Sequence, residues 1–389
     1  MSASDKLRYF IESSISEMTS LSNKYGAINL AQGMPDFDPP NELLEAAVEA
    51  IRHGSNQYPP SPGQPSLREA IARKVKEYNE IDADAEKNVT VTCGSTQAIA
   101  SAIFALTDPH DLVVLTDPFY ENYVPNAILA QCELTYVPFE GPNLTLSEEA
   151  LKGAMEKHPK LLVLTTPNNP TGKVLSVDQL KMIADLCEDN GAIAITDEIY
   201  EHLIYDGKKH VSLATVGHMH DRTITVSGAS KTYSVTGWRI GWAIAEAELT
   251  RALRKVHVYL TVGAPTPLQE ALVTGLNFPR TYYENLAATY DEKRKLVMQV
   301  LDKIELEYHR PEGAYYILIN APRHFKDGHE FADHLLKEVG VALLPADALY
   351  HDKDLGKREV RLAYCKKDVT LKEATNRLTR FSSGQYKAA

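Results

Sequence analysis

Short, almost continuously apolar runs alternate with helical patterns through the middle of the chain. The apolar runs are Val89–Cys93, Leu112–Thr116, Leu161–Thr165, Ala192–Thr196, Thr223–Val226 and Trp238–Ala243. Strands of this kind are typical of a mainly parallel sheet that helices cover on both faces. The helical patterns are Ser95–Leu106, Val177–Asn190 and Leu249–Val256, and Gly191 is well placed to end the second. The alternation predicts an α/β domain.

The pattern changes after about Pro279. A charged helical stretch, a strand, a helix and another strand follow at Tyr282–Ile304, Ala314–Ile319, Glu330–Val339 and Val360–Tyr364. This order predicts a smaller α+β domain. The proline-rich segment up to about Asn41 is expected to run as an irregular arm back toward that domain. We therefore predict a large domain over 42–279 and a small domain formed by 1–41 with 280–389.

Composition and charge narrow the class of protein. The 389 residues carry a formal net charge of −11, which disfavours nucleic acid and anionic membrane as partners because both bind cationic surfaces. Residues 1–26 lack the order of a secretory signal, and no segment approaches the roughly 18 apolar residues of a spanning helix. The cysteines are scattered without a Cys-x-x-Cys pair. We expect a soluble, cytoplasmic protein.

The glycine and histidine spacings exclude several common sites. No Gly-x-Gly occurs, so the dinucleotide fingerprint and the kinase glycine loop are missing, and no Gly-x-x-x-x-Gly-Lys phosphate loop is present. His329 and His334 are five residues apart, whereas the zinc-protease pair is spaced by four. Nicotinamide, ATP and zinc chemistry are therefore disfavoured.

Polar residues follow several predicted strands, where open α/β sheets place their ligands. Gly94–Ala98 opens a helix whose free N–H groups can hold a phosphate, although an ordinary helix cap explains it equally well. Asp117–Tyr123 offers aromatic rings for stacking, or a packed aromatic loop. Pro167–Gly172 has the composition of a rigid turn. Asp197 and Tyr200 end a further strand, which a surface turn also explains.

The run Ser227–Gly241 contains Lys231 among small residues and between two apolar runs. Most lysines are solvated surface charges. Burial of this one would lower its pKa, which is what an amine nucleophile needs.

Taken in order, these motifs resemble the class I and II aminotransferases of the aspartate aminotransferase superfamily, from about Asn29 to Arg380. The resemblance implies fold type I of the pyridoxal-phosphate enzymes, in which helices enclose a mainly parallel seven-stranded sheet and a smaller α+β domain follows. It also implies pyridoxal 5′-phosphate as cofactor, an amino acid and a 2-oxo acid as substrates, and no metal.

The resemblance assigns roles around the cofactor ring. Lys231 would hold the cofactor as a Schiff base and then shuttle the proton of the substrate α-carbon. Asp197 would pair with the pyridine nitrogen and keep it protonated. Tyr200 and Asn169 look like the hydrogen-bond donors to the ring phenolate oxygen, and Tyr120 aligns with the residue that stacks on the ring.

The cofactor phosphate would be bound by Arg239, with donors from Ser95 and Thr96 at the helix start. Many relatives place a phosphate-binding serine three residues before the lysine, and this chain has Gly228 there. Ser227 and Ser230 are the alternatives for that role. Tyr58 resembles the tyrosine that reaches the phosphate of the neighbouring subunit, which implies a homodimer with composite active sites.

The resemblance also places the substrate. Arg361 corresponds to the arginine that clamps the α-carboxylate, although without the resemblance it reads as a surface arginine at a strand end. Gly33 resembles the glycine whose backbone lines the carboxylate site, Met34 would lie near the substrate side chain, and Asn169 belongs to the substrate-binding set as well as to the cofactor set.

The motifs look most like the branch with methionine, glutamine, kynurenine and aromatic aminotransferases. Val258–Val262, near the partner site in relatives, contains no arginine, which disfavours a dicarboxylate pocket. We predict methionine, glutamine or an aromatic, kynurenine-like amino acid as donor. A carbon–sulfur β-lyase would use the same cofactor, lysine and arginine and stays open. Regulators that contain a domain of the same fold usually carry a DNA-binding domain in front of it, and only about thirty residues precede the first motif here, so a regulator is disfavoured.

Overall fold

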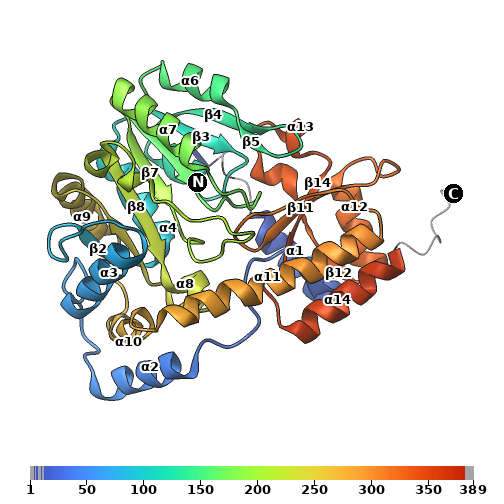
Figure 1. Ribbon diagram of the computed structural model, residues 1–389, viewed down its shortest axis with the longest axis horizontal. Coiled ribbons are helices and arrows are strands. Elements are labelled where there is room, and N and C mark those ends of the chain that lie inside the picture. The colour runs from blue at the N-terminus through green and yellow to red at the C-terminus, as the bar shows by residue number, and fades with distance from the viewer. Residues whose placement is uncertain (1–3, 5, 8–9, 11–12, 382–389) are drawn as a thin grey trace.

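The computed structural model describes residues 4, 6–7, 10 and 13–381. Its main element is a large sheet whose five inner strands are parallel, with antiparallel strands at both edges (Figure 1). In spatial order the strands are β2 (Val89–Thr92), β9 (Gly241–Ile244), β8 (Thr223–Gly228), β7 (Ile193–Asp197), β6 (Leu161–Thr165), β3 (Leu112–Asp117), β4 (Glu133–Glu140) and β5 (Thr145–Leu146).

Successive residues of the inner strands pack against different helix layers. On β6, Leu161 and Val163 lie in a cluster with helix α4 (Gly94–Leu106), whereas Leu162 and Leu164 pack against α6 (Glu148–Met155) and α7 (Val177–Asn190). Both faces of the strand are therefore buried, which explains its unbroken apolar sequence. Each such side chain contributes about 1.5–3 kcal/mol on burial.

The cap predicted for α7 is confirmed. Gly191 follows the helix with φ 70°, and its N–H donates to two carbonyls of the last turn. At the other end, Ser176 and Gln179 form a reciprocal capping box. The remaining helices of this region are α2 (Asn41–His53), α3 (Pro65–Tyr78), α5 (Tyr123–Leu129), α8 (Ala229–Thr232), α9 (Ala247–Thr261) and α10 (Thr266–Leu276).

A smaller antiparallel sheet lies beside the large one, and the long helix α11 (Arg280–Lys303) runs from the region of α10 to it (Figure 1). Its strands are, in order, β10 (Tyr308–His309), β11 (Tyr316–Asn320), β14 (Glu359–Ala363) and β13 (Leu344–Pro345). Helices α12 (Gly328–His334), α13 (Lys353–Gly356) and α14 (Asp368–Phe381) belong to this region, and a π-helical turn, Leu335–Val339, continues α12. The boundaries at 41/42 and 279/280 stay a prediction.

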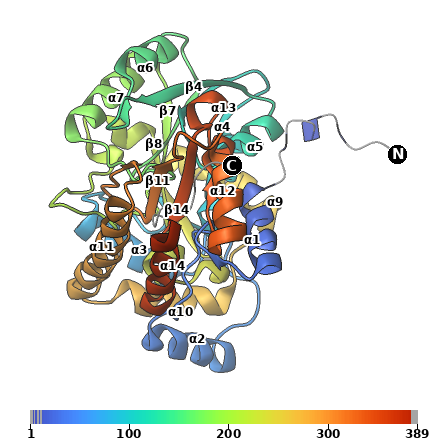
Figure 2. The same ribbon diagram turned by 90° about the vertical axis from the view of Figure 1, so that its right-hand side faces the viewer.

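The N-terminal arm is more regular than predicted. It contains helix α1 (Ser14–Tyr25), which packs near α12 (Figure 2), and strand β1 (Ile28–Asn29). Strand β1 pairs in parallel with β12 (Val341–Ala342), so the arm does return to the small-sheet region. Residues 1–3, 5, 8–9, 11–12 and 382–389 of the predicted small domain lie outside the described residues.

The structure confirms an α/β fold with a mainly parallel sheet, but three details differ. The sheet has eight strands because the two-residue β5 adds an antiparallel edge to β4. Strand β4 was not predicted, because it is partly exposed next to the short edge strand and mixes polar and apolar residues. Trp238 precedes β9 in a 3₁₀ turn instead of beginning the strand. Within the described residues, no helix combines the length and apolarity needed to cross a bilayer.

Candidate active site

A cavity of about 270 Å³ opens at the carboxyl ends of the large-sheet strands, and the small sheet closes one side of it. Every predicted site residue except Tyr58 lines it. From the predicted set the cavity holds Gly33, Met34, Ser95, Thr96, Tyr120, Asn169, Asp197, Tyr200, Lys231, Arg239 and Arg361. Residues from both sheets and from the arm thus meet in one place.

Lys231 extends into this cavity from helix α8, directly after β8. Its Nζ lies 3.4 Å from the carbonyl oxygen of Gly33 and 5.8 Å from the ring centroid of Tyr315. Burial lowers the pKa of Lys231 to about 8, while Cys365 and Asp197 oppose the shift. About a tenth of this amine is therefore unprotonated at pH 7, far more than for an ordinary lysine.

Asp197 is the last residue of β7 and is 4% exposed. Its Oδ2 accepts a hydrogen bond of 2.9 Å from the Tyr123 hydroxyl, and its Oδ1 accepts one of 3.2 Å from the Ile199 N–H. Burial raises the pKa of Asp197 to about 6, against the effect of both hydrogen bonds. A cationic partner in the cavity would stabilise the carboxylate form.

Arg361 comes from β14 of the small sheet and is 0% exposed, so it is not a surface arginine. Its two terminal nitrogens each donate a 2.9 Å hydrogen bond, to Asn169 Oδ1 and to the Ala31 carbonyl. Its Nε is buried and has no partner among the described residues. A buried guanidinium that still has unused N–H donors is suited to an anionic ligand.

Tyr316 of β11 connects the two sides of the cavity. Its hydroxyl lies 3.0 Å from that of Tyr200, and its ring lies 4.4 Å from the Arg361 guanidinium carbon. Burial raises the pKa of Tyr316 to about 12 although Arg361 opposes it, so both phenols are protonated donors at neutral pH. A Cβ at Gly33 would collide with the Tyr316 hydroxyl, which explains why glycine stands there.

The N-terminus of α4 forms the other end of the cavity. Ser95 and Thr96 lie in its first turn, where backbone N–H groups lack helical partners. Arg239 is held in the left-handed conformation, φ 55°, and packs so close to Gly94 that a Cβ there would collide with its guanidinium. A helix start and an arginine together form a site for a phosphate.

The structure separates the two candidate serines near Lys231. Ser230 lines the cavity, whereas Ser227 is buried away from it and donates to Glu201 Oε1 at 2.7 Å. Tyr58 lies outside the cavity and is 83% exposed, so no contact within one chain tests its predicted role.

Several lining residues were missed by the sequence prediction. They are Ile15, Gln32, Glu121, Tyr123, Thr165, Ile199, Thr236 and Tyr316. The spacing of Tyr120 and Tyr123 could have indicated Tyr123, because residues three apart at a helix start share a face. Tyr316 carries no local signal, since only the pairing of β11 with β14 brings it to Arg361.

Comparison with known proteins identifies the family. Residues 25–378 match the family model described as aminotransferase class I and II. The chain belongs to this family. It is 37% identical over 385 residues to the probable N-succinyldiaminopimelate aminotransferase of Mycobacterium tuberculosis, covering 96% of this chain and 97% of that relative. The methionine aminotransferase of Escherichia coli is 33% identical over 363 residues, 93% of this chain and 94% of its own length.

Solved structures agree with this assignment. The N-succinyldiaminopimelate aminotransferase structure from Mycobacterium tuberculosis superposes with a TM-score of 0.94 at 36% identity, covering 97% of this chain and all of the other (100%). Enzymes of this family use pyridoxal 5′-phosphate, so the predicted fold type, cofactor and enzyme class are confirmed. This aminotransferase chain also offers a donor set that fits that cofactor: an amine, a buried carboxylate and a helix start beside an arginine.

Proposed function

We propose that this aminotransferase moves the amino group of a neutral L-amino acid, with a sulfur-containing, amide or aromatic side chain, to a 2-oxo acid. The observation that carries the proposal is the meeting, in one cavity, of the Lys231 amine, the Asp197 carboxylate and the buried Arg361. The first two have pKa values brought toward neutrality by burial. The third keeps a fixed positive charge.

The cofactor would be held from the large-sheet side. Arg239, Ser95 and Thr96 face the place for the phosphate, and Ser230 lies on the same cavity wall. Asp197 would accept a hydrogen bond from the ring nitrogen, and Tyr120 offers the stacking ring. When bound, pyridoxal phosphate supplies an electron-poor ring that accepts the electron pair left at the substrate α-carbon.

Lys231 would attach the cofactor covalently. Once the substrate has replaced it there, the free amine would take the proton from the substrate α-carbon and deliver it to the cofactor. Its pKa of about 8 suits both halves of this task, because a general base works best near the operating pH. The carbonyl of Gly33, 3.4 Å from Nζ, keeps the amine oriented in the cavity.

Arg361 would bind the substrate α-carboxylate and so fix which α-carbon bond faces Lys231. Asn169 and the Ala31 carbonyl hold the guanidinium, and the ring of Tyr316 packs against it. Tyr200 and Asn169 also line the cavity and would donate hydrogen bonds to the phenolate oxygen of the cofactor ring.

The side-chain end of the cavity supports a neutral substrate. Ile15, Met34 and Tyr120 offer apolar contacts there. The described lining residues include no cation besides Lys231, Arg239 and Arg361, each of which has a proposed task. Glu121, which accepts a 2.9 Å hydrogen bond from the Ser13 hydroxyl, would repel a second substrate carboxylate.

A scan of donors tests the proposal. Cofactor-loaded protein is mixed with single L-amino acids without an acceptor, and the loss of the cofactor's visible absorbance is recorded. Methionine, glutamine and aromatic amino acids should convert fastest, and aspartate and glutamate slowest. N-succinyldiaminopimelate belongs in the scan because a relative carries that name. Faster conversion with dicarboxylates would contradict the neutral-substrate proposal.

The same preparation distinguishes a β-lyase. S-substituted cysteines are added without a 2-oxo acid, and pyruvate and ammonia are measured. An aminotransferase converts one donor per site to its S-substituted 2-oxo acid and then stops, releasing neither pyruvate nor ammonia, whereas a lyase releases both continuously. Sustained release of both products would favour the lyase.

We also propose a homodimer in the cytoplasm, with Tyr58 of each chain serving the phosphate site of the other. Its exposure and its position outside the cavity lining of its own chain support this. All four cysteines are free, as expected in a reducing compartment. Light scattering would give the oligomeric state, and Tyr58→Phe should weaken cofactor binding only if the dimer forms.

A further inference from the structure

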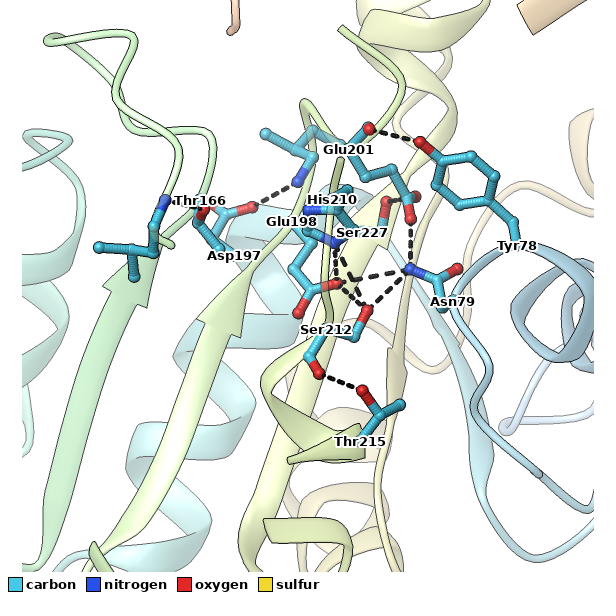
Figure 3. Close-up of polar contacts among 12 residues, drawn as sticks. Tyr78, Asn79, Thr166, Asp197, Glu198, Glu201, His210, Ser212, Thr215 and Ser227 are labelled. Carbon is cyan, nitrogen blue, oxygen red and sulfur yellow. Dashed lines mark hydrogen bonds and ion pairs between the residues drawn. The ribbon is translucent and has the colours of Figure 1, made fainter. Parts of the chain in front are cut away.

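The turn after β7 presents two different faces. Asp197 and Tyr200 line the cavity. Glu198 and Glu201 instead belong to a buried polar network on the other side of the turn (Figure 3). Two carboxylates are therefore buried directly behind the proposed catalytic carboxylate. None of the roles proposed above uses them.

Glu201 is the best connected of these groups. Its Oε1 accepts a 2.7 Å hydrogen bond from the Ser227 hydroxyl, and its Oε2 accepts one of 2.7 Å from Asn79 (Figure 3). The Lys74 ammonium lies 2.6 Å from the same Oε2. The Tyr78 hydroxyl donates to the Glu201 carbonyl at 2.7 Å. The end of helix α3 is thus fastened to this turn by both side-chain and backbone contacts.

The negative charge of Glu201 is compensated inside the network by the ammonium of Lys74. The side chains of Lys74 and Glu201 are 6% and 2% exposed, so each needs the other to remain charged. Burial alone would raise the pKa of Glu201, but Lys74, His202 and His210 together lower it to about 2. Glu201 is therefore an acceptor for Ser227 over the whole physiological pH range.

The Ser227–Glu201 hydrogen bond lies where the strand ladder stops. Strands β7 and β8 pair as far as Asp197 and Val226, and the Glu198 N–H still donates to the Val226 carbonyl at 2.8 Å. One residue later the two segments diverge, β7 into the turn and β8 toward helix α8 and Lys231. The side-chain bond continues the connection between them beyond the last backbone bond.

We propose that Ser227 and Glu201 are positioning residues, whose hydrogen bond fixes the segment that carries Lys231 relative to the one that carries Asp197. The inference rests on the proposed proton-transfer role of Lys231. Proton transfer depends steeply on geometry, because a misplacement of about 1 Å can cost about a hundredfold in rate. Substrate binding depends instead on Arg361, which belongs to the other sheet.

Ser227→Ala tests the proposal with little disturbance, since it removes only the hydroxyl and leaves the Lys74–Glu201 pair intact. Thr225→Val is the matched control, because Thr225 lies two residues earlier on β8 and its buried hydroxyl has no partner among the described residues. The rate of the donor half-reaction is measured by rapid mixing, with α-protonated and α-deuterated amino acid. Melting temperatures are recorded for both variants.

We expect Ser227→Ala to slow the half-reaction about tenfold, with the dissociation constant of the amino acid changed less than about twofold. The α-deuterium isotope effect should stay at or above the wild-type value, because the slowed step is proton transfer. Thr225→Val should match the wild type in the half-reaction rate, in the dissociation constant of the amino acid and in the isotope effect. An unchanged rate in Ser227→Ala, a parallel loss of substrate binding, or an isotope effect falling toward one would each overturn the proposal.

A second variant distinguishes the hydrogen bond from the buried charges. Glu201→Gln combined with Lys74→Met removes both charges but leaves an amide oxygen that can accept from Ser227. This double variant should keep a near-wild-type half-reaction, and a tenfold loss there would overturn the proposal. Failure of the wild type to convert any amino acid would instead reject the proposed function itself.

Discussion

The two walls of the cavity differ in the kind of charge that they offer. On the large-sheet wall, burial moves the pKa of Lys231 down to about 8 and that of Asp197 up to about 6. On the small-sheet wall, Arg361 keeps its charge because a guanidinium does not lose its proton in proteins. The groups with pKa values near neutrality thus lie on the large-sheet wall, which also carries the guanidinium of Arg239, whereas the charged group that lines the small-sheet wall is Arg361.

The difference follows from the hydrogen bonds that each wall provides to its buried cation. Arg361 is compensated by two neutral oxygens, of Asn169 and Ala31, which hold it without taking its proton. Lys231 has one long contact, to the Gly33 carbonyl, so desolvation dominates its pKa. We infer that chemistry is assigned to the large sheet and substrate binding to the small sheet. The predictions below test that division.

The strongest test removes the amine of the large-sheet wall. Lys231→Ala should lower kcat about a thousandfold or more, because attachment of the cofactor and proton transfer depend on the same group. Lys231→Arg keeps a positive charge, but a guanidinium does not release its proton and so cannot act as a general base. This variant should therefore be as inactive as Lys231→Ala. Both are assayed with excess cofactor and the best donor from the scan. Recovery of activity in the arginine variant would show that only the charge matters.

Arg361→Ala tests the small-sheet wall. It should raise KM for the amino acid about a hundredfold, the effect expected for losing a charge-assisted bidentate contact, and change cofactor affinity little. Arg239→Ala is the contrasting variant and should weaken cofactor more than substrate. The division between the walls fails if Arg361→Ala releases the cofactor, or if Arg239→Ala mainly raises KM.

The large-sheet wall was predicted well from sequence because its parts are local. Each proposed group follows an apolar strand, and the carboxyl ends of parallel strands meet at one edge, so Ser95, Asp197 and Lys231 were expected together. The end of α7 was equally readable, because Gly191 is a local signal, whereas the Ser176–Gln179 capping box was not predicted although it is just as local.

The small-sheet wall was harder to predict because its parts meet only through tertiary pairing. Arg361 reads as a surface residue until β14 is placed between β11 and β13, and only the family resemblance indicated it. Tyr316 and Ile15 had no local pattern at all, and Ser227 could not be told from Ser230. The direction of one side chain, toward Glu201 or toward the cavity, decides between those serines.

The titration of Lys231 gives a smaller effect that is specific to the large-sheet wall. The free amine reacts, so labelling of Lys231 by a trace of small acylating reagent should rise about tenfold per pH unit up to about 8 and then level off. An ordinary lysine, with a pKa of 10.5, would continue to rise beyond pH 9. Cofactor-free protein is labelled, digested and analysed by mass spectrometry, with the other lysines as internal reference. A plateau above pH 10 would mean that the amine is not desolvated.

The hydroxyl pair between the walls gives the smallest effect. Tyr316→Phe removes one partner of the 3.0 Å contact with Tyr200 but keeps the ring beside Arg361. A single neutral hydrogen bond is worth about 1 kcal/mol, so kcat/KM should fall only about fivefold. Tyr200→Phe supplies the second edge of a double-mutant cycle. If the walls act through this bond, the double variant should lose less than the product of the single losses. Fully multiplicative losses would instead mean that each phenol acts on its own wall, Tyr200 toward the cofactor and Tyr316 toward Arg361.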